Sequence, residues 1–154
     1  MRSKLIVLLT VITLLIVSTI PSFAAVPSNM ETKIELFADG SYAIITIEEE
    51  TNTTPFAVAK TKTAQATYEY HSVQGKHEWD FFLKGTFSYD QKTAKATAAS
   101  INHKIHIDGW KRSSGDSWTT GATAKGKGTF KYLTLTKNVE LGLKCSPTGT
   151  ITAV

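Results

Sequence analysis

The stretch from residue 77 to residue 89 alternates large apolar and polar side chains and is broken only at Phe82. Because successive side chains of a β-strand point to opposite faces, this period of two predicts a long strand with one buried and one solvated face. At about 3.3 Å per residue the strand spans about 40 Å, enough to cross a sandwich of two sheets. The face predicted to be buried carries His77, Trp79, Phe81, Leu83, Gly85, Phe87 and Tyr89. We therefore expect Trp79 to lie in the core, and Glu78 and Asp80 to share the opposite, polar face.

The same period of two recurs along most of the remaining chain, and no stretch after residue 25 has the 3.6-residue period of a helix. Asp39-Gly40 and Asp108-Gly109 are typical turn dipeptides that separate the extended stretches. About eight such stretches predict an all-β fold, an antiparallel β-sandwich, with a flattened β-barrel as the alternative. Within this fold we expect polar loops at 48–55 and 113–116. We also expect a bulge near Ala99-Ser100, where the apolar residues change parity.

The first 24 residues have the composition of a cleaved secretory signal helix. Arg2 and Lys4 give a positive start, and residues 5–20 are uncharged and mostly apolar. Ser22-Phe23-Ala24 then places small residues at the −3 and −1 positions of a cut before Ala25. The apolar run is about 16 residues long, shorter than the roughly 20 that a membrane-spanning helix needs. We expect residues 1–24 to be removed, which leaves residues 25–154 as a single secreted, extracellular domain without a transmembrane span.

Charge is distributed unevenly along the chain. The whole sequence has a formal net charge of +4, of which Arg2 and Lys4 leave with the signal. Residues 25–90 carry 10 acidic and 5 basic side chains, whereas residues 91–154 carry 3 acidic and 10 basic ones. The small net charge of the mature domain does not favour nucleic acid as a partner, and we expect none. The basic second half suits an anionic partner such as a cell-wall polymer, and it equally suits ion pairs between strands.

Cys145 is the single cysteine of the chain, so no disulfide within the chain supports the fold. A domain of about 130 residues is large enough to bury a core without one. Cys145 shares its parity with Val139, Leu141 and Leu143, which predicts a buried thiol. The alternative is a disulfide between two chains.

Several short motifs occur together with the signal peptide. They are Asp39-Gly40-Ser41-Tyr42, Thr61-Lys62-Thr63 before Tyr68 and Tyr70, Trp79 followed by Leu83-x-Gly85-Thr86-Phe87-x-Tyr89, Trp110, Ser114-Gly115-Asp116, Ala122-x-Ala124, and Leu143-x-Cys145-Ser146-x-x-Gly149-Thr150. This arrangement resembles a group of small secreted β-rich proteins of anaerobic Gram-positive bacteria, and the resemblance covers nearly the whole mature chain. It implies a secreted β-rich domain. The group has no assigned activity, so the resemblance implies no functional residue.

Four histidines raise the question of a metal site. His103 and His106 are three residues apart on an extended stretch, which places them on opposite faces. His71 and His77 flank a turn and approach each other only if their strands form a hairpin. A carboxylate of the same strands would then add an oxygen ligand, from Glu69 or Glu78. Neither a helical His-x-x-x-His nor a Cys/His cluster is present, so we expect no metal site and no cofactor.

Signals for catalysis are weak. Glu78 and Asp80 would lie about 7 Å apart on one strand face, a separation compatible with glycoside hydrolysis. The pair alternates with other polar residues, however, in the way that is typical of a solvated strand face. No serine lies in a Gly-x-Ser-x-Gly elbow. We therefore expect the chain not to be an enzyme.

Two tryptophans are the strongest candidates for ligand contact. Trp110 and Trp118 flank residues 111–116, which we expect to form a turn that begins with Lys111 and Arg112. Aromatic rings beside polar turn residues stack on sugar rings, and neighbouring cations suit an anionic surface. The predicted binding site is therefore Trp110, Lys111, Arg112 and Trp118. The alternative is that each tryptophan caps one end of the core.

These observations favour a secreted, non-enzymatic β-domain that binds a surface, a carbohydrate or a protein, with cell-wall polymer as one such partner. An alternative of another class is a bacteriocin-like or membrane-active antagonist, because amphipathic hairpins and a basic second half suit lipid headgroups. A secreted hydrolase ranks third.

Overall fold

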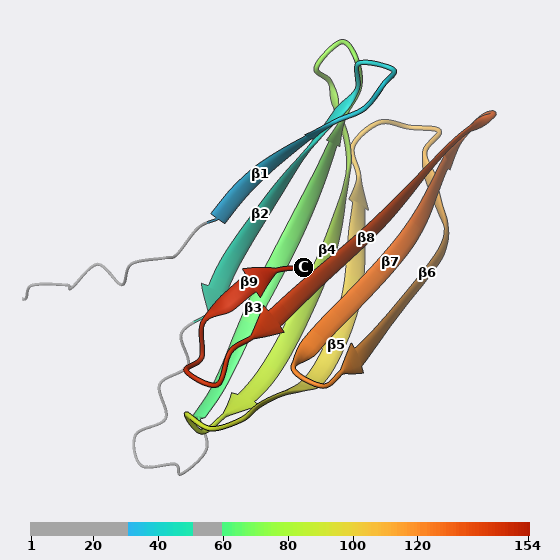
Figure 1. The fold of residues 1–154 in the computed structure, drawn as a ribbon. Coiled ribbons are helices and arrows are strands. Elements are labelled where there is room, and N and C mark those ends of the chain that lie inside the picture. The colour runs from blue at the N-terminus through green and yellow to red at the C-terminus, as the bar shows by residue number, and fades with distance from the viewer. Residues whose placement is uncertain (1–30, 51–59) are drawn as a thin grey trace, which may run out of the picture.

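The computed structural model describes residues 31–50 and 60–154, and within these two ranges the chain forms nine strands and no helix (Figure 1). The strands are β1 (Glu31–Leu36), β2 (Tyr42–Glu50), β3 (Lys60–His71), β4 (His77–Tyr89), β5 (Ala94–Ile105), β6 (Lys111–Thr120), β7 (Thr123–Tyr132), β8 (Leu135–Cys145) and β9 (Ile151–Ala153). The all-β prediction is confirmed. The predicted signal peptide, residues 1–24, lies outside the described residues. In the two described ranges no helix is long and apolar enough to span a bilayer.

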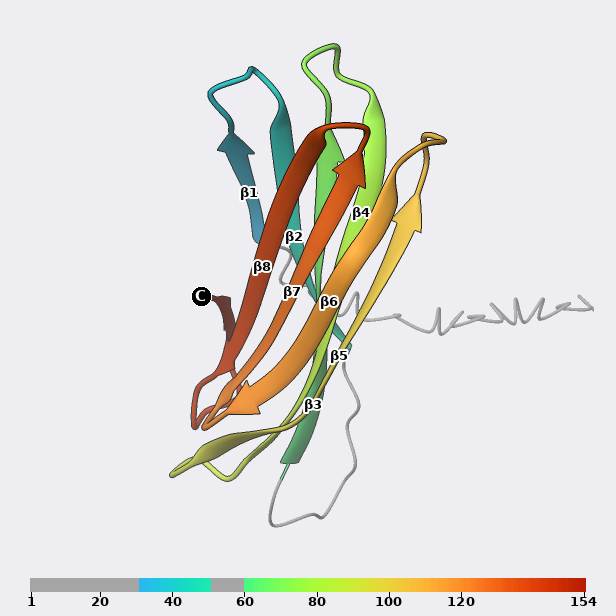
Figure 2. The same cartoon turned by 90° about the vertical axis from the view of Figure 1, so that its right-hand side faces the viewer.

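The strands form two antiparallel sheets that face each other, as Figures 1 and 2 show from two sides. One sheet has the order β1-β2-β3-β4-β5 and the other the order β6-β7-β8-β9, so each sheet is a simple meander. Among the described residues no strand of one sheet pairs with a strand of the other. The flattened-barrel alternative is therefore wrong, and the described residues form nine strands, in agreement with the prediction of about eight.

The core lies between the sheets and is built around Trp79 of β4. Its side chain is 0% exposed, and its ring stacks on Phe130 of β7 with 3.8 Å between the ring centroids. Tyr68 and Tyr70 of β3 stack against the same indole. Cys145 is free and also buried, and burial raises the pKa of its thiol. Both sequence predictions, a core Trp79 and a buried Cys145, are confirmed.

A bulge at Glu78 interrupts the alternation at the start of β4. Tyr70 pairs with Trp79 and His71 pairs with His77, which leaves Glu78 without a partner in β3. One extra residue reverses the parity of the chain that precedes it. His77 is thereby moved to the opposite face from the one that the sequence predicts.

The bulge also separates two carboxylates that the sequence places together. Asp80 lies on the outer face, where the His77 ring bonds to it. Glu78 instead accepts a hydrogen bond from the indole Nε1 of Trp110, at 2.6 Å. The prediction that Glu78 and Asp80 share a face is wrong, because the extra residue turns Glu78 away.

Two further local predictions need correction. The bulge predicted near Ala99-Ser100 is present in β5, but it falls two residues earlier, at Thr97, because Thr86 pairs with Ala98 and Phe87 with Ala96. Residues 48–50 end β2 instead of starting a polar loop. Two of these glutamates form ion pairs with lysines of the same sheet: Glu49 with Lys62 of β3 at 2.9 Å and Glu50 with Lys84 of β4 at 2.9 Å. The rest of that predicted loop, residues 51–55, lies outside the described residues.

Tyr68 gives the fold a measurable dependence on alkaline pH. Burial, followed by the nearby charge of Glu35, raises the pKa of its phenol above the usual value near 10. The unfolded chain ionises this phenol near pH 10 while the folded chain keeps it neutral, so the free energy of unfolding falls as pH rises above about 10. We expect denaturant unfolding between pH 8 and pH 11 to show this loss. Tyr68→Phe should reduce it, and an equal loss in both proteins would contradict the assignment.

Candidate functional site

The segment between Trp110 and Trp118 is a strand rather than a turn. β6 covers Lys111–Thr120 and pairs with β7 along its length, with one irregularity between Arg112 and Ser114. At about 3.3 Å per residue the two tryptophans are separated by about 25 Å. The prediction of a turn that brings them together is wrong, because β7 supplies backbone partners even to this polar sequence.

Trp110 belongs to the core end. It is 5% exposed, its Nε1 donates to Glu78, and its ring packs between Tyr70 and Tyr132. For Trp110, the alternative interpretation, in which the tryptophan caps one end of the core instead of contacting a ligand, is therefore the one observed. Trp110 still borders a groove of about 440 Å³ at the loop end of the sheets, but little of its ring faces solvent.

Lys111 and Arg112 lie on opposite faces of β6, because they are neighbours on a strand. Lys111 is exposed and pairs with Lys131. Arg112 pairs with Phe130, which is buried in the core, and its Nη1 is buried with no hydrogen-bond partner among the described residues. Burial of the His103 ring lowers its pKa, and the positive charge of Arg112 lowers it further. The two cations therefore do not form one patch.

Trp118 lies on the outer face of the four-stranded sheet. Asp116 lies two residues earlier on the same face. In the strand register it lies opposite Lys127 of β7, and Lys127 lies opposite Glu140 of β8. The Nζ atom of Lys127 lies 5.5 Å from the centroid of the Trp118 ring, a cation–π contact. The ring is only partly buried, so one part remains open to a ligand.

A shallow concavity of about 660 Å³ lies beside Trp118 on this face. It is lined by Ser114, Gly115, Asp116, Lys127, Gly128, Thr129, Asn138, Val139 and Glu140. Gly115 and Gly128 lie opposite each other in β6 and β7, and a Cβ at either position would point toward the other sheet, so these residues line the concavity with backbone alone. Around it stand hydroxyl, amide, carboxylate and ammonium groups, which are the groups that bond to a polyhydroxylated or anionic polymer.

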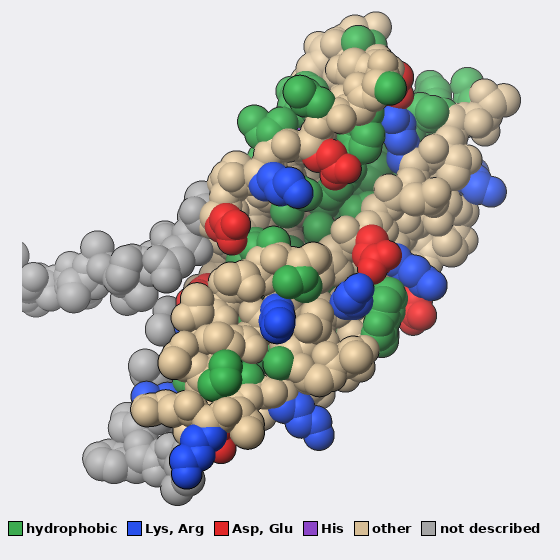
Figure 3. Space-filling model, in the orientation of Figure 1, with side chains coloured by type: hydrophobic (Ala, Val, Ile, Leu, Met, Phe, Trp, Pro, Cys, Tyr) green, Lys and Arg blue, Asp and Glu red, His purple; other side chains and the backbone are tan. Residues whose placement is uncertain are grey.

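The face around the concavity is basic. The register places five lysines on it: Lys111, Lys125, Lys127, Lys131 and Lys144. Its carboxylates include Asp116 and Glu140, and Glu140 pairs with Lys125 at 3.2 Å. Figure 3, which views the molecule from the side of β8, shows lysine and arginine side chains beside carboxylates over β7 and β8. Of the predicted site residues, Trp118 and Lys111 lie on this face, whereas Trp110 and Arg112 do not.

A second cluster lies on the outer face of the five-stranded sheet, where β3, β4 and β5 end or begin. Asp80 is 7% exposed, and its two carboxylate oxygens meet two imidazoles. His77 Nε2 bonds to Oδ1, and His106 Nε2 lies 2.8 Å from Oδ2. The ring centroids of His77 and His106 are 4.1 Å apart. The carboxylate thus bridges two histidines from different strands.

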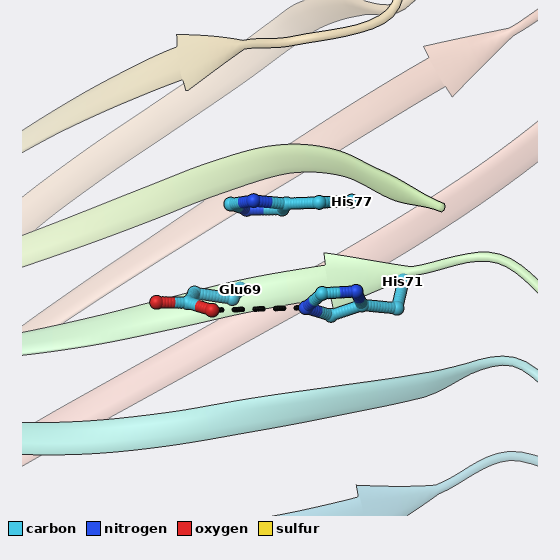
Figure 4. Close-up of side chains that lie close together, drawn as sticks. All are labelled: Glu69, His71 and His77. Atoms are coloured by element: carbon cyan, nitrogen blue, oxygen red, sulfur yellow. Dashed lines mark ion pairs between the residues drawn. The ribbon is translucent and has the colours of Figure 1, made fainter. Parts of the chain in front are cut away.

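His71 extends this cluster. Its ring stacks on Tyr42 and on His77, with 4.7 and 4.8 Å between the ring centroids. Figure 4 shows His71 beside Glu69, whose Oε2 lies 3.6 Å from the His71 Nε2, with the His77 ring next to the pair. Neither ring nitrogen of His71 has a hydrogen-bond partner among the described residues.

The sequence predicted part of this cluster. His71 and His77 do meet across the β3–β4 hairpin. His103 and His106 lie on opposite faces of the sheet, as predicted: His103 packs against Phe130 in the interior, and His106 lies on the outer face. The convergence of His77 with His106 and Asp80 was missed, because the bulge at Glu78 leaves no signal in the alternation. Comparison with known proteins adds no further residue: no family model, no curated protein and no solved structure matches this chain.

Proposed function

We propose that this chain is a secreted, non-enzymatic domain that binds an anionic cell-wall polymer on the outer face of β6, β7 and β8. The observation that carries the proposal is the coincidence, on one face, of a concavity, a partly exposed tryptophan and five lysines. The sequence of residues 1–24 supports secretion, and the resemblance to small secreted proteins of Gram-positive bacteria agrees with a cell-wall ligand.

Physical chemistry favours a charged polymer over a compact ligand at this face. The concavity is shallow and open, so it suits a chain that lies across several strands. Lysines attract repeated phosphates or carboxylates over a Debye length of about 8–10 Å, and the Trp118 ring offers an apolar surface to a sugar or polyol unit. Each such contact contributes about 0.5–2 kcal/mol, so binding should be modest per site and sensitive to salt.

The test is binding to poly(glycerol phosphate), compared with a neutral glycan of similar length. We expect Trp118→Ala and Lys127→Gln each to weaken binding to the anionic polymer by about twofold to thirtyfold, the factor that 0.5–2 kcal/mol represents. Lys95→Gln, an exposed lysine of the other sheet, is the matched control and should change binding less than twofold.

Added salt should weaken binding of the anionic polymer by the wild type. The difference in affinity between the wild type and Lys127→Gln should therefore become smaller as salt is added. Equal binding of the neutral glycan, or anionic binding that survives both substitutions on the β6–β8 face, would overturn the proposal.

A membrane-active antagonist is the second candidate, and one observation favours it. Several large apolar side chains are exposed at one end of the sheets, where four hairpin and connecting loops meet: Leu36, Val73, Ile107, Leu133 and Leu135. Exposed apolar loop tips of this kind suit insertion between lipid headgroups. Leakage of anionic vesicles that is abolished by Leu133→Ser, and not by Trp118→Ala, would favour this candidate over polymer binding.

A further inference from the structure

We propose that His77, Asp80 and His106 form a binding site for a borderline transition-metal cation of the Zn²⁺ class. The site lies on the five-stranded sheet, on the opposite side of the molecule from the polymer-binding face proposed above, and does not depend on that function. His77 and Asp80 come from the start of β4, and His106 directly follows the end of β5.

The ligand atoms are already gathered to the size of one ion. One nitrogen or oxygen from each of the three residues lies within 4.8 Å of the others. A tetrahedral Zn²⁺ ion with bonds of about 2.0–2.1 Å separates its ligand atoms by roughly 3.4 Å. Small rotations of the two imidazoles therefore suffice to open a position between them and Asp80.

The donor set selects the class of ion. Two imidazole nitrogens and one carboxylate oxygen suit Zn²⁺, Cu²⁺ or Ni²⁺, whereas Ca²⁺ and Mg²⁺ take oxygen ligands almost exclusively. Three protein ligands leave a fourth position for water or for a further donor. In the hydrogen bonds to Asp80 the Nε2–H of each histidine donates to the carboxylate. For an ion to bind, each imidazole must be neutral with its proton on Nδ1, which leaves the Nε2 lone pair free for the ion.

A second observation points the same way. The Nδ1 atom of His71, whose ring stacks on His77, is shielded from solvent and has no hydrogen-bond partner among the described residues, an arrangement that costs free energy unless something else meets this atom. Glu69, His71 and His77 form a second group whose ligand atoms also lie within 4.8 Å. On the other side of His77, Glu69 adds negative charge and His71 adds a further nitrogen ligand atom, and both strengthen the attraction for a cation.

The test uses the protein without a histidine tag, titrated with ZnCl₂ in competition with a chromophoric chelator. We expect a stoichiometry of one ion per chain and a thermal unfolding midpoint that rises with Zn²⁺. His77→Gln and His106→Gln each keep an N–H that can bond to Asp80 but lose the imidazole ligand. Each should weaken Zn²⁺ binding at least tenfold.

The fourth histidine supplies a matched control. His103→Gln leaves the cluster intact and should bind Zn²⁺ as the wild type does. Co²⁺ bound in place of Zn²⁺ should show ligand-field bands without a thiolate charge-transfer band, since Cys145 is buried and is not a ligand.

Four results would overturn the proposal: no binding of Zn²⁺ by the wild type, equal binding of Ca²⁺, a thiolate band, or undiminished binding in the His77→Gln/His106→Gln double variant. Should His106→Gln fail to fold, the variant at the more exposed histidine, His77→Gln, decides alone.

Discussion

Replacing Trp79 with alanine is expected to lower the free energy of unfolding by about 3–5 kcal/mol, the usual cost of deleting a large buried aromatic side chain. The indole is fully buried and stacks on Phe130 at 3.8 Å, so it joins the two sheets. Tyr68 and Tyr70 pack against its other side at 5.6 and 5.0 Å. Trp110, whose ring centroid lies 5.9 Å from that of Trp79, is a fourth aromatic neighbour. Alanine would leave a cavity among these four rings that the long strands around it cannot close.

Chemical denaturation of the purified protein measures this loss. Trp118→Ala is the matched control, because it removes the same side chain from the outer face of a strand and should cost much less. A loss below about 1 kcal/mol for Trp79→Ala, or equal losses for the two variants, would contradict the position of the core.

Placing valine at Gly126 is expected to destabilise the fold by about 1–3 kcal/mol, the cost of overpacking a filled core. Gly126 of β7 faces the opposite sheet, and a Cβ added there would lie 2.5 Å from Cγ2 of Ile101 and 3.1 Å from Cδ1 of Leu83. These contacts are too short for carbon atoms, so the side chains of β4 and β5 must move apart.

Lys125→Val is the control for this substitution. It places the same β-branched residue one position earlier on β7, on the outer face, where it breaks only a partly exposed ion pair with Glu140. Such a pair contributes little, so the control should lie within about 1 kcal/mol of the wild type. Denaturant melts of both variants give the comparison, and a harmless Gly126→Val would mean that the sheets are less closely packed than described.

The sequence predicts the fold where side chains alternate strictly. The buried row that contains Trp79 and Leu83 is confirmed, because a period of two has one structural meaning over such a length. β6 could not be predicted in this way, since residues 113–117 are small or polar and β7 alone makes them a strand. The three glutamates at 48–50 likewise carry no strand signal in the sequence, because Lys62 and Lys84, the partners of Glu49 and Glu50, are distant in sequence.

The candidate sites depend on information that the sequence does not display. The cluster of His77, Asp80 and His106 exists because Glu78 is an extra residue in the ladder, and a bulge of one residue changes parity without a compositional signal. On the other sheet, Trp118 was recognised as a candidate contact. Its true neighbours, Lys127 and Glu140, come from β7 and β8 and meet it only through strand register.

Mapping amide chemical shifts during titration with poly(glycerol phosphate) is the most direct test of the proposed binding face. We expect the largest shifts in residues 114–118, 125–129 and 138–140, which are adjacent segments of β6, β7 and β8. They should diminish as salt is added. Shifts confined to the loop end around Val73 and Leu133, or no shifts at saturating polymer, would contradict the proposed binding face.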